Sequence, residues 1–588
     1  MTQPVLPRLR LLAALLLAPA LLVAPAHPFT AEAATANAPP PSPAPLSRNE
    51  LNPATEAPEM RTLRPDVLAP PSEGPCPIDV PGLSFQLKAV RFQGASTASA
   101  RDLARAYRHR LGATITLKDV CRIRDSATRI LFQMGVLARV DVPPQRIADG
   151  TLTLSITQAV ITSVEVRGGP GPIVSRIRAM MSPYQGRLFD MRRFYRDLAL
   201  ANDLPGVSVS PLLRINPNAQ GGMDLILTVR RRPVSALAFA QNSGSPATGR
   251  DTVLTRIDLN SFTPFGEQNT LVLQDTPATH RQQVIQWTGE ARPLPGGWVV
   301  RGSASWGRSR PGGAISPLSI VSDSFVASAA VSYPLIRTRL RDVALTAGME
   351  WVDQHTNLFK TEAFSKDHLR IAYLQADARQ DWGALGLMPA GSLTVNGQAR
   401  QGLLGLGASS RTNPLTSRDG GAPDALDFRE GGQISLFWTP QVRSLLSLTA
   451  QQSGDPVMSY ESLSAGALSV GRGYDPSAIS GDSGVMGAAE LHLGPARIPQ
   501  PFAALRPLTR DATVEGLVFF DNAYVKRFGA YGAPSSEASL RSIGAGVSVQ
   551  LGPRLRADVT YAKPLLSLSK AGPTPSGRWL VRLVAIGF

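Results

Sequence analysis

The amino-acid sequence predicts a mainly β protein, in which a C-terminal transmembrane antiparallel β-barrel follows two smaller α+β domains. From about Val234 onward, apolar and polar residues alternate in many short runs, as in strands with one lipid-facing side. Residues 76–233 instead show helix and strand periodicities in the order β-α-α-β-β, twice in succession. No interior segment reaches the roughly 20 consecutive apolar residues that a spanning helix needs. Together these three observations favour a barrel over a helical membrane protein.

The first residues have the pattern of a secretory signal peptide. Arg8 and Arg10 precede an apolar run, Leu11–Ala24, and small residues follow near Ala33. The run is too short to serve as a membrane anchor. We therefore expect residues 1–34 to direct export.

A stretch rich in Pro, Ala and Ser follows at residues 35–75. This composition cannot form a packed core and predicts an extended linker. Within it, Asn49–Arg61 is the only place where a short helix is plausible.

The first compact domain is expected at residues 76–158. Its pattern predicts, in order, strand Leu87–Gly94, helix Ser99–Leu111, helix Leu117–Gly135, strand Leu137–Val142 and strand Thr151–Thr157. Thr116 is the expected N-cap of the second helix, because a threonine hydroxyl accepts hydrogen bonds from first-turn amides.

The second compact domain is expected at residues 159–233 and repeats this order. Its predicted elements are strand Ile161–Gly168, helices Val174–Met181 and Asp190–Asn202, and strands Val207–Ile215 and Met223–Val229.

The chain has two cysteines, Cys76 and Cys121, both in the first domain. In an exported protein an isolated pair predicts one disulfide bond. Two buried free thiols are the alternative that the residues leave open.

The third domain is expected at residues 234–588. Alternation such as Phe325, Ala327 and Ala329 against Ser328 would also suit a soluble β-sandwich. Its persistence over some 350 residues behind a signal peptide favours a transmembrane barrel. Thr263–Gly266 and Gly296-Gly297 have the composition of short periplasmic turns.

Charge and motifs argue against several other classes of protein. The net charge of +16 comes from scattered arginines, with no aromatic interleaving and no nucleic-acid-binding motif. The six histidines lack metal-ligand spacing, and there is no Walker motif. We expect no enzyme activity, no cofactor, no metal and no nucleic-acid partner.

Two short motifs suggest a specific site. Val470-Gly471-Arg472-Gly473-Tyr474 lies in a polar, turn-rich segment, and Phe519-Phe520-Asp521 lies in a predicted strand. Period-two geometry places Phe519 and Asp521 on one face of that strand and Phe520 on the other. If Phe520 faces lipid, Asp521 points into the barrel, where it needs a cation such as Arg472. A surface arginine and an unrelated strand aspartate are the alternative.

At these residues the sequence resembles the outer-membrane transporters of two-partner secretion, the haemolysin secretion/activation type. That family carries a V-R-G-[FY] loop motif and an F-x-D strand motif, and the loop here is one residue off the commonest form. The repeated β-α-α-β-β order resembles its two periplasmic POTRA domains. The run Val142–Leu152 resembles its first POTRA domain, and Cys76 and Cys121 fall where it places a disulfide pair.

The resemblance implies a barrel of 16 strands. It also implies a loop-to-barrel contact made by Arg472, Gly473, Tyr474, Phe519 and Asp521. Asp482 and Glu490 are candidate acidic neighbours of that arginine, and the linker can hold a helix that plugs the barrel. The terminal Phe588 resembles the signal by which the barrel assembly machinery recognises outer-membrane barrels.

The function implied is a bacterial outer-membrane pore, with POTRA domains in the periplasm and outer-membrane lipid around the barrel. Its expected partner is a large secreted exoprotein of adhesin or haemolysin type with an N-terminal two-partner secretion domain, exported without ATP. An outer-membrane protein assembly factor is the first alternative, and a passive porin is the second.

Overall fold

The protein is described from a computed structural model. The structure describes residues 45–53, 83–94, 98–147, 149–168, 171–219, 221–338, 340–467, 470–497, 512–568 and 574–587. The predicted signal peptide, most of the predicted linker, Cys76 and Phe588 lie outside the described residues.

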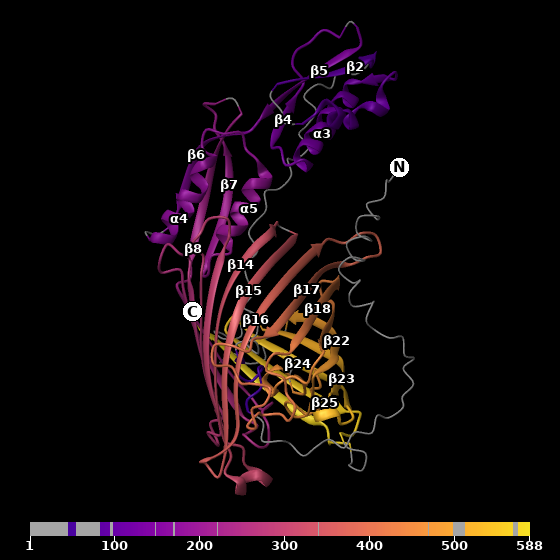
Figure 1. Ribbon diagram of the computed structural model, residues 1–588. Coiled ribbons are helices and arrows are strands. Elements are labelled where there is room, and N and C mark those ends of the chain that lie inside the picture. Colours follow the sequence, from indigo (N-terminus) through magenta and orange to yellow (C-terminus); the bar gives the residue numbers. More distant parts are fainter. Residues whose placement is uncertain are drawn as a thin grey trace, which may run out of the picture.

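The C-terminal part is a closed antiparallel barrel of sixteen strands, as the fold prediction requires (Figure 1). Every strand pairs with its neighbour in the chain, and the last strand pairs with the first. In chain order the strands are β9 (Val234–Gln241), β10 (Thr252–Asn260), β11 (Gln268–Asp275), β12 (Gln282–Ala291), β13 (Val299–Ser309), β14 (Val321–Arg337), β15 (Arg341–Leu358), β16 (Glu362–Trp382), β17 (Ala390–Gly402), β18 (Leu426–Thr439), β19 (Val442–Ser453), β22 (Ser483–Arg497), β23 (Thr513–Arg527), β24 (Ser536–Leu551), β25 (Leu555–Pro564) and β26 (Arg578–Gly587).

The alternation along the strands separates an outer apolar face from an inner polar one. On β14, Ser322 and Ser324 are buried inside the barrel, whereas Phe325 and Val331 are exposed on the outside. An exposed apolar band around a closed barrel is the surface that outer-membrane strands present to lipid.

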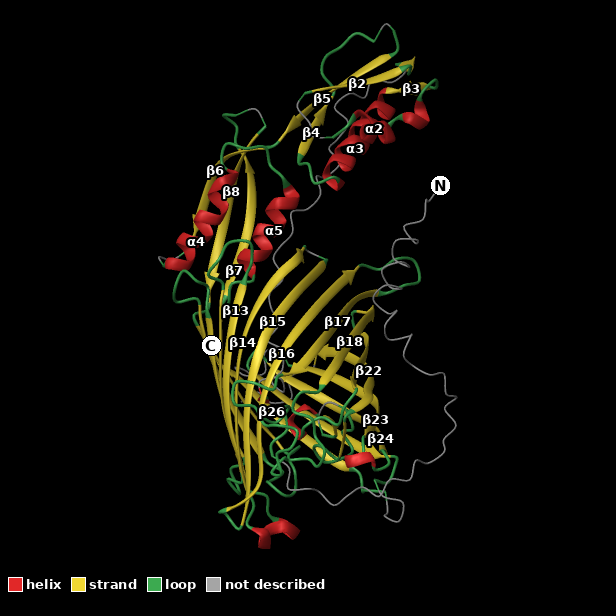
Figure 2. Cartoon of the chain, viewed as in Figure 1, coloured by secondary structure: helices red, strands yellow, loops and turns green. Residues whose placement is uncertain are grey.

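The strands differ markedly in length. β14, β15 and β16 have 17 to 21 residues, whereas β9 and β11 have 8 each. A tilted strand crosses a bilayer with about 9–11 residues, so the long strands extend beyond it. Figure 2 shows this taller side, which carries a short 3-10 helix, Gly313–Leu318, near its tip.

The first domain has a three-stranded sheet in the order β2-β5-β4, covered by helix α3. Its elements are β1 (Ser84–Gln86), β2 (Ala89–Gln93), α2 (Ala100–Leu103), β3 (Thr114–Thr116), α3 (Leu117–Gln133), β4 (Ala138–Asp141) and β5 (Thr151–Gln158). Thr116 caps α3 as predicted, within a capping box whose other member is Asp119.

One predicted helix of this domain is wrong as a continuous element. Instead of Ser99–Leu111, the chain forms α2 and two 3-10 turns, Ala104–Ala106 and Arg108–Arg110. Tyr107 interrupts them, because its backbone angles (φ −136°, ψ −15°) leave the helical region. A small second sheet, formed by β1 and β3, was not predicted from the periodicity.

The second domain repeats the plan, with sheet order β6-β8-β7 and two helices packed against the sheet. Its elements are β6 (Val160–Arg167), α4 (Pro172–Met181), α5 (Met191–Asn202), β7 (Val207–Ile215) and β8 (Gly222–Arg231). Asp190 caps α5, because its side chain accepts hydrogen bonds from the amides of Arg192 and Arg193 at 2.9 and 3.2 Å.

The second domain contacts the barrel end that carries the predicted periplasmic turns. Asp203 accepts a hydrogen bond from Nε of Arg337 on β14 at 2.8 Å. Ser261, in the β10–β11 turn, donates to the carbonyl of Pro205 at 2.6 Å, and Arg176 donates to the carbonyl of Pro264 at 2.7 Å. These contacts hold the second domain against the turns.

Residues 45–53, from the predicted linker, lie inside the barrel. Leu46 and Leu51 are buried against inward-facing residues of the wall, among them Val352 on β15. Ser47 and Glu50 cap a single turn, in which the Leu51 amide donates to the Ser47 carbonyl at 3.0 Å. The rest of the helix predicted at Asn49–Arg61 lies outside the described residues.

Other predictions concern features that are only partly described. Cys121 is buried on α3, but Cys76 lies outside the described residues, so the disulfide bond stays a prediction. Among the described residues, no helix is long and apolar enough to cross a membrane. No cluster suited to a metal ion occurs in that same part of the chain.

Candidate functional site: an inward loop anchored to the barrel wall

The segment between β19 and β22 folds into the barrel. It begins with a 3-10 turn, Ser459–Glu461, and forms a two-stranded hairpin from β20 (Leu463–Ala465) and β21 (Ile479–Gly481). Apolar side chains of this hairpin pack against the inner faces of β22, β23 and β24. We call residues 454–482 the inward loop. Its tip carries the Val470–Tyr474 motif.

Asp521, on β23, accepts several of the hydrogen bonds that hold this tip to the wall. Its carboxylate is fully buried and lies on the inner face of β23, whereas Val518 and Phe520 are exposed on the outer face. It accepts hydrogen bonds from the backbone amides of Gly471 and Arg472 at 3.1 and 2.9 Å. The hydroxyl of Ser542, on β24, donates to it at 3.0 Å.

The Arg472 side chain completes the contact. Its Nε and Nη2 donate to the Asp521 carboxylate at 3.1 and 2.6 Å, and Nη1 donates to Glu490, on β22, at 2.7 Å. The guanidinium also lies over the Phe519 ring, 3.6 Å from its centroid. Arg472 thus has two carboxylates and an aromatic face, which together compensate its removal from water.

The neighbouring glycines are required by the geometry. Gly471 has φ +91°, in the left-handed region that favours glycine. At Gly473 a Cβ would lie 2.8 Å from the backbone nitrogen of Pro564, so only glycine allows the loop this close to β25. Tyr474 then fixes the far side, because its hydroxyl lies 2.9 and 2.8 Å from the carbonyls of Arg541 and Leu566.

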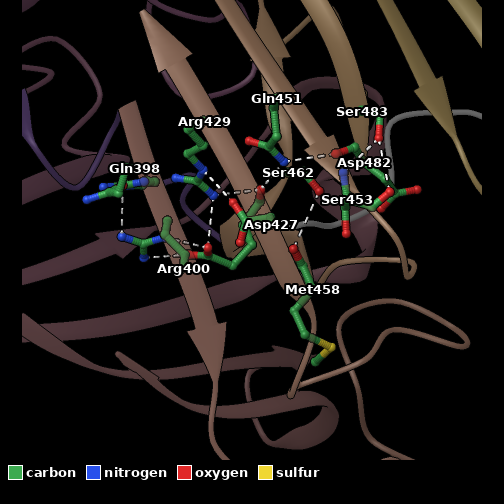
Figure 3. A network of polar contacts seen from close by, with 12 residues as sticks. Gln398, Arg400, Asp427, Arg429, Gln451, Ser453, Met458, Ser462, Asp482 and Ser483 are labelled. Atoms are coloured by element: carbon green, nitrogen blue, oxygen red, sulfur yellow. Dashed lines mark hydrogen bonds and ion pairs between the residues drawn. The ribbon is translucent and has the colours of Figure 1, made fainter. Parts of the chain in front are cut away.

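A second network anchors the base of the inward loop. Figure 3 shows Arg400 and Arg429 beside Asp427, on the strands β17 and β18. Arg400 is fully buried and donates to Glu461 of the loop at 2.8 Å and to Glu350 on β15 at 2.6 Å. Gln451 donates to the carbonyls of Glu461 and Asp482 at 2.8 and 3.0 Å, which joins the two ends of the loop.

This network also reaches the segment 45–53. Nη2 of Arg48 lies 3.7 Å from Oε1 of Glu350, and the same carboxylate accepts a hydrogen bond from Arg400. The inward loop and the N-terminal segment therefore share one group of charges on the barrel wall.

The prediction that Asp482 is an acidic neighbour of Arg472 is wrong. Asp482 is fully buried, but it pairs with Arg418, from the loop between β17 and β18. It also accepts hydrogen bonds from the amides of Val457 and Phe528 at 2.7 and 2.6 Å. Asp482 is the last residue of the inward loop. Its carboxylate therefore joins the base of this loop to the β17–β18 loop and to the segment after β23, and does not contact the Arg472 side chain at the tip. Glu490, the other predicted neighbour, does contact Arg472.

No motif in the sequence identifies Arg400, Arg418 or Glu461. Arg400 and Glu461 are 61 residues apart, and Arg418 and Asp482 are 64 apart. A charged residue at an inward position of an alternating strand is a signal that could have identified Arg400 and Glu350. That signal does not indicate that the two residues pair with each other. Among the described residues, no group of His, Cys, Asp and Glu side chains could hold a metal ion. The contacts that the site does make are charge pairs that hold the inward loop in position.

A closed sixteen-stranded barrel, a polar interior with an inward loop, and two domains at one end define an outer-membrane β-barrel protein with periplasmic POTRA domains. A family model described as "POTRA domain, ShlB-type" matches residues 85–158, and one described as "Haemolysin secretion/activation protein ShlB/FhaC/HecB" matches residues 221–509. The chain belongs to this family of outer-membrane transporters for two-partner secretion.

Solved structures share the fold over most of the chain. CdiB from Escherichia coli is 18% identical, with a TM-score of 0.68, and the match covers 92% of this chain and 95% of that one. CdiB from Acinetobacter baumannii is 15% identical, with a TM-score of 0.60 and coverage of 92% and 97%. No curated protein matches the sequence.

Proposed function

We propose that this transporter recognises one large secreted polypeptide, of adhesin or haemolysin type, and exports it through the barrel without ATP. The secreted partner arrives unfolded in the periplasm and docks its N-terminal secretion domain on the POTRA domains. It then threads through the pore, and its folding outside gives the passage a direction. We assign no catalytic residue to the chain.

The POTRA domains offer sheet edges for this recognition. In the first domain β2 and β4 are edge strands, and in the second β6 and β7 are. An extended client can add a strand to such an edge, because unpaired backbone groups supply affinity and side-chain pockets supply specificity.

The observation that carries the proposal is the anchored inward loop. Arg472 and Asp521 join the loop tip to the wall inside the pore, where the translocating chain has to pass. A loop held in one position leaves a defined path, whereas a released loop would occupy the lumen in many positions.

The test is Arg472→Ala, which removes the side-chain contacts to Asp521, Glu490 and Phe519. Secretion of the partner should fall to background, while the folded barrel remains in outer-membrane fractions at wild-type amounts. Arg556→Ala is the matched control, since Arg556 pairs with Asp558 on β25 and makes no described contact with the loop. Wild-type secretion by Arg472→Ala would refute the role of the contact.

Two further measurements separate the alternatives. Depleting the transporter should lower one exoprotein, and a general loss of outer-membrane barrels would instead indicate an assembly factor. Deleting residues 76–233 should abolish export, whereas a passive porin would keep its conductance and its physiological function. Insertion of the barrel itself is proposed to depend on the assembly machinery and on Phe588.

A further inference from the structure

His492 lies in the barrel wall, two residues after Glu490 on β22 and on the same face of that strand. Its ring is largely buried, with 14% of the side chain exposed. The contact between Arg472 and Asp521 does not involve it, and none of the sequence motifs includes it. Its surroundings nevertheless connect it to the inward loop.

Both ring nitrogens of His492 face carboxylate oxygens. Nε2 lies 2.8 Å from Oε2 of Glu490, and Nδ1 lies 2.6 Å from Oε1 of Glu515, on β23. An ionised carboxylate only accepts hydrogen bonds, and a neutral imidazole carries a single N–H. Two such contacts therefore need one proton more than the neutral ring holds.

The other charged groups around His492 fit this protonation. Arg443, directly opposite on β19, lies 3.2 Å from both Nδ1 and Glu515 Oε1. Because Glu515 is closer to Nδ1 than Arg443 is, the ring nitrogen donates and Arg443 donates to the same carboxylate. On β25, Arg556 is already paired with Asp558 at 2.7 Å.

The charges of the cluster balance only when His492 is cationic. Arg443, His492 and Arg472 then supply three positive charges, against three negative charges on Glu490, Glu515 and Asp521. A neutral ring would leave an uncompensated negative charge in the partly buried cluster, which is costly.

We propose that His492 is a positioning residue that holds Glu490 for Arg472 and makes the anchoring of the inward loop dependent on one proton. The inference rests on the proposed role of the anchored loop in export. Glu490 uses one oxygen for each partner, Oε1 for Arg472 and Oε2 for His492. Losing the proton breaks one of the two hydrogen bonds that the His492 ring donates. The ring then no longer bridges the carboxylates of Glu490 and Glu515, which can move apart. The contact between Glu490 and Arg472 is loosened as a result.

The direction of the pH effect follows from this arrangement. The bridge is present at low pH, where the ring is protonated, and is lost as the pH rises and the ring releases its proton. The Arg472–Asp521 contact does not include the His492 ring, so losing the His492 proton leaves it in place. The Arg472 side chain is therefore held by both Asp521 and Glu490 at low pH, whereas at high pH its contact with Glu490 is loosened and Asp521 remains its main partner.

The first measurement reads the proton directly. The full-length protein, labelled with ¹⁵N-histidine and reconstituted in lipid bilayers, is compared by solid-state NMR with His492→Gln to assign the signal. At about pH 7.5, where an ordinary imidazole is mostly neutral, both ring nitrogens of His492 should be protonated. A single protonated nitrogen at that pH would overturn the proposal.

The second measurement reads the loop. Openings of the purified full-length pore are counted in planar bilayers from about pH 6 to about pH 9. The wild-type opening frequency should rise about tenfold over this range, the size of change that a lost charge-assisted hydrogen bond of about 1.4 kcal/mol produces. His492→Gln should open frequently at every pH, and His492→Lys, which stays cationic, should open rarely at every pH. A flat wild-type profile, or a wild-type profile in His492→Gln, would overturn the proposal.

The outcomes also separate this inference from the proposed function. If Arg472→Ala secretes normally while wild-type openings still depend on His492 and pH, the export role of the loop fails and the proton linkage stands. If secretion needs Arg472 but neither measurement depends on His492, the export role stands and the linkage fails. Heat-modified electrophoretic mobility shows that each variant has folded, and the NMR measurement needs only the wild-type fold.

Discussion

Replacing Asp521 with asparagine tests the inward loop most sharply. Asp521→Asn keeps the size of the side chain, but it removes the charge that faces Arg472 and turns one oxygen into an amide donor. Contacts to the Arg472 side chain, two backbone amides and Ser542 converge on this fully buried group. Breaking one partner of a buried pair typically costs about 3–5 kcal/mol. Glu490 still neutralises Arg472 in part, so we expect about 3 kcal/mol.

The assay is urea unfolding of the protein in lipid bilayers, followed by tryptophan fluorescence, with a double-mutant cycle between Asp521→Asn and Arg472→Ala. If the two side chains act as a pair, the double variant should lose at least about 1 kcal/mol less than the sum of the single variants. Asp558→Asn is the matched control, since Asp558 also pairs with an arginine but stands away from the loop. Additive losses, or a loss no larger than that of Asp558→Asn, would refute the reasoning.

Three further outcomes are expected. Asp482→Asn removes one partner of the buried pair with Arg418 and should destabilise the neighbouring loops by about 3–5 kcal/mol. Protease should then cleave the extracellular loops of intact cells faster, and unchanged cleavage would contradict this. Leu51→Asp should place a charge in the apolar cluster that holds residues 45–53 against the wall. Conductance through the purified pore should then rise above that of the wild type. Unchanged conductance would contradict the expectation that this segment obstructs the pore. The Thr116 amide and the Arg110 guanidinium lower the pKa of Asp119 to about 2. The stabilisation of α3 by Asp119 is therefore complete above about pH 4 and is lost toward pH 2. Asp119→Ala should destabilise α3 by about 1 kcal/mol at neutral pH, measured by hydrogen exchange, and should remove this acid dependence.

Much of the fold could be predicted from the sequence, because the decisive signals are local. Alternation of apolar and polar residues is a property of neighbours in the chain, and it located the barrel and the inward face of Asp521. Capping is equally local, which is why Thr116 and Asp190 are found at the starts of α3 and α5. The helix expected at Ser99–Leu111 failed for a reason that periodicity does not record, the backbone break at Tyr107.

The candidate site was harder to predict, since its charge pairs depend on which strands become neighbours. Arg472 and Asp521 were accessible because two short motifs pointed to them. For Asp482 the sequence predicts the wrong arginine, because closeness in sequence to the loop tip does not fix a position inside the barrel. Its partner Arg418 comes from another loop, and only the closed strand order brings the two together.

The attachment of the second POTRA domain has a consequence for the order of events in export. Asp203 and Pro205 hold that domain against Arg337 and Ser261 at the barrel rim. Under the proposed docking, a client strand on the edge of this domain would be confined near the pore entrance. Its entry becomes an intramolecular step with an effective concentration on the order of millimolar, far above that of an unfolded exoprotein free in the periplasm. Capture would then supply most of the selectivity, and the pore would need to discriminate little.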